Sequence, residues 1–183
     1  MKGRKDKGTK TSYFVLYFTG ETMSKDLKTA SIIFAAGKGS RMKGYEGNKT
    51  LLPLIPGDSP FDGKHPMLME ILNNLPPGPK ALVVNHGKED VIRLTGSFDL
   101  TYCEQPVLNG TGGALIASRD FIINASYDQL LITMGDVPLI KPSTFNSLLE
   151  SLNNCHMAVL GFRPLDKKKY GTDLISAIQA FTP

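Results

Sequence analysis

The segment that indicates the fold is Ser31-Ile32-Ile33-Phe34-Ala35-Ala36-Gly37-Lys38-Gly39-Ser40-Arg41-Met42. Its first six residues are apolar or small at every position, a pattern typical of a strand that is covered on both faces of a sheet. The strand leads directly into a turn with two glycines, where the backbone can approach a phosphate and direct its N–H groups toward it. The segment therefore predicts a buried strand that ends at an anion-binding turn.

Similar apolar runs follow along the chain. They lie at residues 81–84, 100–103, 129–134 and 157–162, and helical patterns lie at residues 65–74, 112–121 and 142–152. Strands that alternate with helices predict an α/β fold in three layers, with a Rossmann-like, mostly parallel sheet between helices. Ligands of such sheets bind beyond the carboxyl ends of the strands. Residues 56–66 are rich in proline and glycine, and we expect one long loop there that forms a mobile flap near the site.

Composition excludes several classes of protein. The chain has 183 residues, of which 41% are hydrophobic and 21% charged, which is typical of a globular domain and not of collagen-like, disordered or membrane-spanning proteins. Cys103 and Cys155 are too few for a disulfide framework, so we expect both to be reduced in a cytoplasmic protein. Residues 1–30 hold seven basic and three acidic side chains, whereas residues 31–183 hold 14 of each. Because the net charge of +4 lies in the leader, the body lacks the basic field of a nucleic-acid binder.

The start of the chain has a basic stretch followed by six apolar residues at 13–18. A secretory signal needs an apolar region of roughly 7–15 residues and a small-residue cleavage site, so we do not assign one. We expect residues 1–30 to form a disordered basic leader, residues 31–171 the folded domain and residues 172–183 an atypical tail. Whether residues 1–22, which precede Met23, are translated stays open at this point.

The glycine turn fits neither of two common phosphate-binding motifs. A dinucleotide fingerprint requires glycine where Met42 stands, and a Walker loop starting at Gly44 requires glycine where Lys49 stands. Taken alone, the turn is equally consistent with a phosphate cradle and with an ordinary solvated turn that carries surface lysines.

The ordered set of blocks resembles the sugar-1-phosphate nucleotidyltransferases. The glycine turn is followed by Lys49 before an apolar run, by residues 63–67 (Gly-Lys-His-Pro-Met), by residues 85–87 (Asn-His-Gly), by Gln105 with residues 110–114, and by residues 135–139 (Gly-Asp-Val-Pro-Leu). Within the family the chain is most similar to the uridylyltransferase domain that acts on N-acetylglucosamine 1-phosphate. The resemblance spans about residues 31–171 and implies the nucleotide-diphospho-sugar transferase type of fold.

The resemblance implies a Mg²⁺-dependent reaction in which a sugar 1-phosphate attacks the α-phosphorus of a nucleoside triphosphate, most naturally UTP, and releases pyrophosphate. Because the second pKa of a phosphate is about 6, this nucleophile is already mostly dianionic at neutral pH and needs no side-chain base. The three histidines form no recognisable triad, in keeping with this chemistry. We expect no nucleic-acid or membrane partner, and the sequence does not indicate the oligomeric state.

The family motifs also imply roles for individual residues. Arg41 would stabilise the triphosphate and the transition-state charge, Lys49 would hold phosphates, and Asp136 would bind Mg²⁺, although Asp136 could instead cap a turn. Gln105 would contact the edge of uracil, accepting from the ring N3–H and donating to a carbonyl, and the same amide could read thymine. Gly110 and Thr111 would close over the base or ribose, where a side chain at 110 would intrude, and Gly171 would face the sugar. The expected nucleotide-binding residues are Phe34, Ala35, Ala36, Gly37, Gly39, Gln105, Gly110, Thr111, Met134 and Gly135.

The resemblance ends at Gly171, and residues 172–183 do not match the continuation of the family. We therefore expect a chain truncated at its C-terminus that lacks further sugar contacts and a second carboxylate for Mg²⁺. This leaves two alternatives to the enzyme: a truncated, noncatalytic nucleotide-binding protein of the same fold, and a basic-tailed nucleic-acid binder, which the neutral body disfavours.

Overall fold

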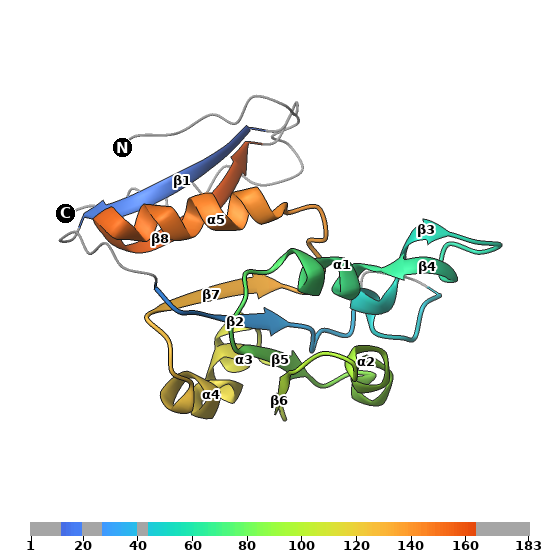
Figure 1. The fold of residues 1–183 in the computed structure, drawn as a ribbon. Helices are drawn as coiled ribbons and strands as arrows, with labels where there is room; N and C mark the ends of the chain where they lie inside the picture. Colours follow the sequence, from blue (N-terminus) through green and yellow to red (C-terminus); the bar gives the residue numbers. More distant parts are fainter. Residues whose placement is uncertain (1–11, 20–26, 40–43, 164–183) are drawn as a thin grey trace. The chain divides into compact units, whose positions relative to one another are not determined.

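The computed structural model describes residues 12–19, 27–39 and 44–163. The chain forms two compact units: residues 24–149 make the larger one, and residues 1–23 together with residues 150–183 make the smaller one. The larger unit contains a parallel sheet with helices, and the smaller unit contains a pair of antiparallel strands (Figure 1).

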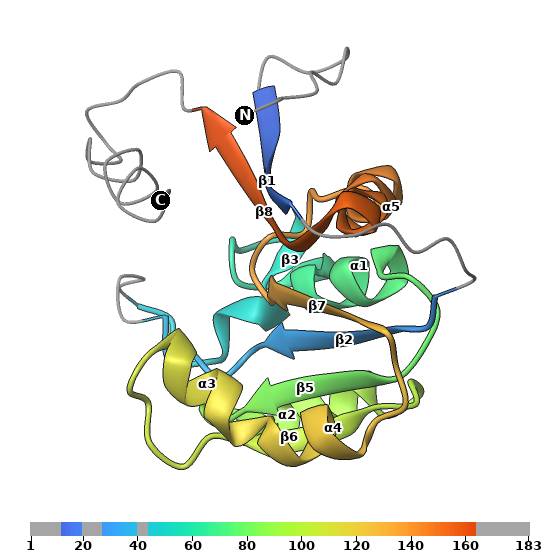
Figure 2. The same cartoon turned by 90° about the vertical axis from the view of Figure 1, so that its left-hand side faces the viewer.

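The sheet of the larger unit has four parallel strands in the order β6-β5-β2-β7. These are β2 (Thr29–Phe34), β5 (Lys80–Val84), β6 (Thr101–Glu104) and β7 (Gln129–Met134). Figure 2 shows β7, β2 and β5 running in the same direction. The first strand of this sheet in chain order, β2, lies inside it, with β5 on one side and β7 on the other, which confirms the Rossmann-like order.

Helices cover both faces of this sheet, as the three-layer prediction requires. One layer contains α1 (Met67–Asn74), α2 (Lys88–Thr95) and α5 (Pro142–Ser151), and the other contains α3 (Thr111–Ala117) and α4 (Arg119–Asn124). Alternate residues of β2 enter the two layers: Ile33 packs in the cluster with Leu68 and Phe145, and Ile32 in the cluster with Phe121. Both isoleucines are fully buried, which explains why residues 31–36 are apolar or small at every position.

The predicted helix at 112–121 is two helices instead, α3 and α4, which meet at Ser118. The buried Ser118 donates its hydroxyl to the carbonyl of Leu115 at 2.8 Å. This bond competes with the regular helix ladder and explains the break. Helix α2 is not predicted from its residues, because only Val91 and Thr95 are buried and two buried positions make a weak helical pattern.

The loop expected at 56–66 is in part a hairpin. Strands β3 (Pro53–Pro56) and β4 (Gly63–Pro66) pair antiparallel, and only residues 57–62 connect them. The amide of Gly57 donates to the carbonyl of Asp62 at 2.7 Å and closes the turn. Proline and glycine at the strand ends concealed this pair, because both residues usually mark loops.

The smaller unit differs from two expectations. Ser12–Thr19, expected in a disordered leader, form strand β1, and the strand predicted at 157–162 is part of β8 (Cys155–Arg163), which pairs with β1. β8 was expected to join the main sheet, but among the described strands it pairs with β1 alone. The aromatic and β-branched residues of 13–18 have high strand propensity, which accounts for β1. Residues 1–11, 20–26 and the tail from 164 onward lie outside the described residues.

Within the described ranges, no helix has the length and apolar character needed to cross a bilayer.

Replacing Ile33 with alanine should lower the free energy of unfolding by about 2–5 kcal/mol, because the change leaves a cavity in a close-packed core. Ile123→Ala, at a position on α4 that is 61% exposed, is the matched control and should change it by less than about 0.5 kcal/mol. Urea titrations followed by far-UV circular dichroism measure both variants. Equal losses in the two variants would contradict the assignment of the core.

Candidate functional site

The candidate site lies at the carboxyl edge of the parallel sheet. The segments that follow β2, β5, β6 and β7 all emerge at this edge, since parallel strands end on the same side. Between β2 and β7 the order of the strands reverses: the chain leaves β2 toward β5 and β6, and then returns to β7 on the other side. Such a reversal is where open α/β sheets bind their ligands.

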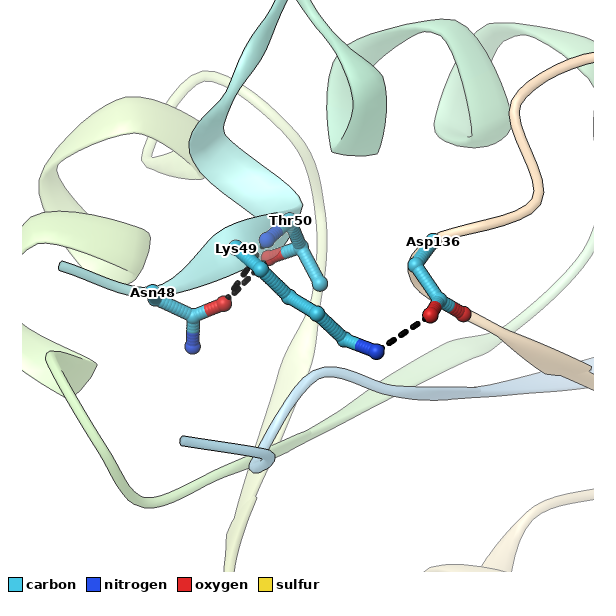
Figure 3. Close-up of polar contacts among 4 residues, drawn as sticks. All are labelled: Asn48, Lys49, Thr50 and Asp136. Carbon is cyan, nitrogen blue, oxygen red and sulfur yellow. Dashed lines mark hydrogen bonds and ion pairs between the residues drawn. The ribbon is translucent and has the colours of Figure 1, made fainter. Parts of the chain in front are cut away.

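An ion pair joins the two sides of this reversal. Lys49 begins the short helix η1 (Lys49–Leu51), and Asp136 follows β7. The Nζ of Lys49 donates to Oδ2 of Asp136, 87 residues further along the chain (Figure 3). The two side chains are 32% and 28% exposed, so a ligand can still reach both charges. The structure thus brings together two of the three predicted catalytic residues; the third, Arg41, lies outside the described residues, as does Gly171.

The buried Asn48 precedes Lys49 and was not singled out from the sequence. Its Nδ2 donates to the carbonyls of Ala35 at 2.6 Å and His86 at 2.8 Å. Its Oδ1 accepts from the backbone amide of Thr50 at 3.0 Å and from the Thr50 hydroxyl at 2.8 Å, as Figure 3 shows. An asparagine at the start of a helical turn is a common N-cap, and that signal could have identified it.

The first residues after β2 serve the protein interior. Ala35 and Ala36 are 1% and 4% exposed, and their carbonyls accept hydrogen bonds from Asn48 and from the amide of His86. Exposure begins at Gly37, where an added Cβ would have no neighbour within 4 Å. The predicted backbone contacts of Ala35 and Ala36 with a nucleotide stay a prediction.

Gly39 has a positive φ of 61°, and a Cβ there would lie 3.2 Å from the Cβ of Lys49. The glycine turn consequently lies against the aliphatic stem of Lys49. A side chain at 39 would be strained by its backbone angle and crowded by the lysine.

Gln105 is 3% exposed, and its amide nitrogen is fully engaged. Nε2 donates to Oδ1 of Asn109 at 3.1 Å and to the carbonyl of Gly110 at 3.2 Å. The backbone amide of Gln105 donates to the carbonyl of Val84, and the backbone carbonyl of Gln105 accepts from the side chain of Asn85 at 2.7 Å. A carboxamide has two N–H donors, so only Oε1 has capacity left for a base. The contact of Gln105 with uracil stays a prediction, for which Oε1 is the available atom in this conformation.

The remaining predicted positions frame this edge. Gly110 and Thr111 are exposed at the start of α3, and an added Cβ at 110 would meet no protein atom within 4 Å. The φ of 95° at Gly110, and not contact with the protein, accounts for the glycine. Phe34 and Met134 end the paired strands β2 and β7, and Met134 is 38% exposed.

Gly135 brings Asp136 next to η1. Its amide donates to the carbonyl of Phe34 at 2.9 Å, and a Cβ would lie 2.9 Å from that same oxygen and 2.9 Å from Cγ2 of Thr50. A larger residue would separate η1 from the end of β7.

Two ionisable groups near the sheet edge are held neutral. The pKa of Tyr45 is raised mainly by burial and to a smaller extent by the negative charge of Asp90. The Tyr45 hydroxyl donates to the Asn48 carbonyl at 3.2 Å. The pKa of the Cys103 thiol is raised mainly by burial and to a smaller extent by the negative charge of Asp120. Neither group is activated as a nucleophile, because activation requires the opposite shift.

A model of the MobA-like NTP transferase domain matches residues 31–182. The chain belongs to this family. The match confirms the resemblance to nucleotidyltransferases, and it includes residues 172–182, which the sequence analysis set apart as a tail.

Curated relatives agree with this membership, and a solved structure has a similar fold. The bifunctional protein GlmU of Novosphingobium aromaticivorans is 34% identical over 153 residues, which cover 80% of this chain and 31% of the relative, and GlmU of Zymomonas mobilis is 33% identical over 82% of this chain and 34% of the relative. The chain spans about a third of the length of these relatives. A nucleotidyl transferase from Methanothermobacter thermautotroptrophicus has a similar fold, with a TM-score of 0.53 and 19% identity over 69% of this chain and 58% of that one.

Gly135→Ala should lower the free energy of unfolding by about 1–3 kcal/mol, because the new methyl group must displace Thr50 or the end of β2. Gly37→Ala is the matched control, since its methyl group meets open space, and should change stability by less than about 0.5 kcal/mol. Denaturant titration of the ligand-free protein measures both. Similar stability of the two variants would show that the close packing at Gly135 is not a constraint.

Proposed function

We propose that this chain is a nucleotidyltransferase that moves a nucleotidyl group, uridylyl in particular, from a nucleoside triphosphate to a sugar 1-phosphate with release of pyrophosphate. The observation that carries the proposal is the Lys49–Asp136 ion pair at the strand-order reversal between β2 and β7. A cation and a carboxylate side by side, both open to solvent, suit a ligand that combines phosphates with a metal ion.

For this reaction the protein must orient the reacting phosphates and stabilise the charge of the transition state. The attacking phosphate is already dianionic at neutral pH, so the site needs to orient two phosphates in line and to offset the charge that develops between them. The ammonium of Lys49 has three N–H donors and uses one on Asp136, so two remain for phosphate oxygens. The backbone of Lys49 in η1 and its partner Asp136, just after β7, hold this charge in place before a ligand arrives, which favours electrostatic stabilisation.

Asp136 has the donor chemistry that Mg²⁺ requires. The described residues contain no group of three or more His, Cys, Asp and Glu that could hold a metal by themselves. Mg²⁺ in nucleotide sites commonly uses one or two carboxylates and takes its other ligands from phosphates and water, so a single accessible Asp136 fits. When bound, the ion would supply charge neutralisation at the phosphates.

The base specificity follows from Gln105 in this proposal. With Nε2 engaged, Oε1 accepts a hydrogen bond from the ring N3–H of uracil, whereas N3 of cytosine is itself an acceptor. UTP is thereby favoured over CTP, and thymidine triphosphate is not excluded. Gly37, Gly39, Gly110 and Thr111 frame the nucleotide, Arg41 in the glycine turn contacts the triphosphate, and Gly171 faces the sugar.

Calorimetric titration with UTP and Mg²⁺, followed by a pyrophosphate-release assay with N-acetylglucosamine 1-phosphate, tests this function. Lys49→Met and Asp136→Asn should each lower the rate by about 10²–10³-fold, the usual effect of removing one group that stabilises transition-state charge. Lys141→Met, at an exposed position before α5, controls for the loss of a surface lysine and should keep the wild-type rate.

The outcomes separate the alternatives. UTP binding that depends on Lys49 and Asp136, without pyrophosphate release from any sugar 1-phosphate, would identify a noncatalytic nucleotide-binding protein. Absence of UTP binding at every Mg²⁺ concentration would reject both readings.

A further inference from the structure

Asn48 connects three separate segments of the site through one side chain. Its amide nitrogen bonds the carbonyl of Ala35, just beyond β2, and that of His86, beyond β5, which lie 13 and 38 residues away in the sequence. Its oxygen bonds the amide and hydroxyl of Thr50 in η1. The side chain is therefore a junction between two neighbouring strand ends and the turn that carries Lys49.

The carboxamide is used to full capacity. It has two N–H donors and an oxygen that accepts two bonds, and all four are made inside the protein by a residue that is 1% exposed. Because both partners of Nδ2 are carbonyl oxygens, the orientation of the amide is determined. Aspartate has no donor for these carbonyls, and serine has a single hydroxyl, so asparagine is the residue of this size that satisfies all four partners.

This junction fixes the position of the Lys49 backbone. The Asn48 carbonyl accepts from the amide of Leu51 at 3.0 Å, which closes η1 around the lysine. The methyl group of Thr50 lies against Gly135, and the stem of Lys49 lies against Gly39. A flexible four-carbon side chain can present its ammonium at one point only if its backbone is held, and Asn48 holds it.

The geometry points to Asn48 as the positioning residue for Lys49: it ties η1 to the ends of β2 and β5 so that the ammonium of Lys49 meets Asp136 across the β2–β7 reversal. Asn48 is 1% exposed and acts through the lysine, without touching substrate. The role of the ammonium in phosphate binding rests on the proposed function, whereas the positioning itself is a property of the ligand-free protein.

The Lys49 ammonium can be observed directly by ¹⁵N NMR of the lysine side chains in the full chain without ligand. Its resonance is assigned by its loss in Lys49→Met, and its response to the ion pair is defined by Asp136→Asn. Asn48→Ala should shift or broaden this resonance as Asp136→Asn does. Asn74→Ala also removes two side-chain hydrogen bonds, to Glu70 and to the Ile140 carbonyl, but lies on α1 and should leave the resonance unchanged.

A double-mutant cycle on the affinity for magnesium UTP provides the second readout. Asn48→Ala should raise the Kd by about tenfold in the wild-type background and by less than about twofold in the Lys49→Met background, since the effect acts through the lysine. A general structural role would give the same factor in both backgrounds. If Asn48→Ala does not fold, Asn48→Ser, which keeps an acceptor for the Thr50 amide, carries the same expectations.

An unchanged Lys49 resonance in the folded Asn48 variants, or equal Kd factors in the two backgrounds, overturns the inference. Failure of UTP to bind removes the proposed function only, because the NMR comparison then still decides whether Asn48 positions Lys49.

Discussion

The carbonyl groups at the carboxyl edge of the parallel sheet are the constraint on which this site depends. Backbone carbonyls at the end of a buried strand need hydrogen-bond donors, since burial of a carbonyl without a partner is costly. Here the carbonyls of Phe34, Val83 and Val84 accept from backbone amides of neighbouring segments, and those of Ala35 and His86 accept from Asn48. Within the part of the chain that the structure describes, every buried side-chain nitrogen and oxygen has a partner. The segments that satisfy this edge are the same ones that carry the candidate functional residues.

The proposed function requires a body with balanced charge to bind an anionic ligand at a local site. Residues 31–183 have equal numbers of acidic and basic side chains, so long-range attraction of a triphosphate is not expected. Attraction must come from a few groups held at close range. The ion pair of Lys49 with Asp136 keeps one such cation at the strand-order reversal, and its partial exposure leaves room for exchange of partners.

Much of the fold was predictable because its signals are local. The runs at 31–36, 81–84 and 129–134 each correspond to a strand of the sheet. The first two strands are buried between the two helical layers, whereas β7 leaves Ile132 and Met134 exposed. Where the prediction differed, the deciding interaction was one that the pattern of apolar residues does not reveal. Ser118 divides one expected helix by a side-chain bond, and the hairpin of β3 and β4 depends on cross-strand pairing between residues that resemble a loop. The strand at Cys155–Arg163 has the expected pattern, but its pairing with Ser12–Thr19 could not be read from either segment alone.

The amino-acid sequence by itself determined the family, the α/β class and the positions of Lys49, Gln105 and Asp136 in ordered motifs, because these depend on residue type and spacing. Tertiary structure alone decided that Lys49 pairs with Asp136, that both N–H groups of Gln105 are engaged, and that Asn48 joins two strand ends to η1. These three facts require groups up to 87 residues apart to meet at one sheet edge. Spacing along a chain says which groups exist, and only the packing of parallel strands brings their ends, and therefore their side chains, within hydrogen-bonding distance.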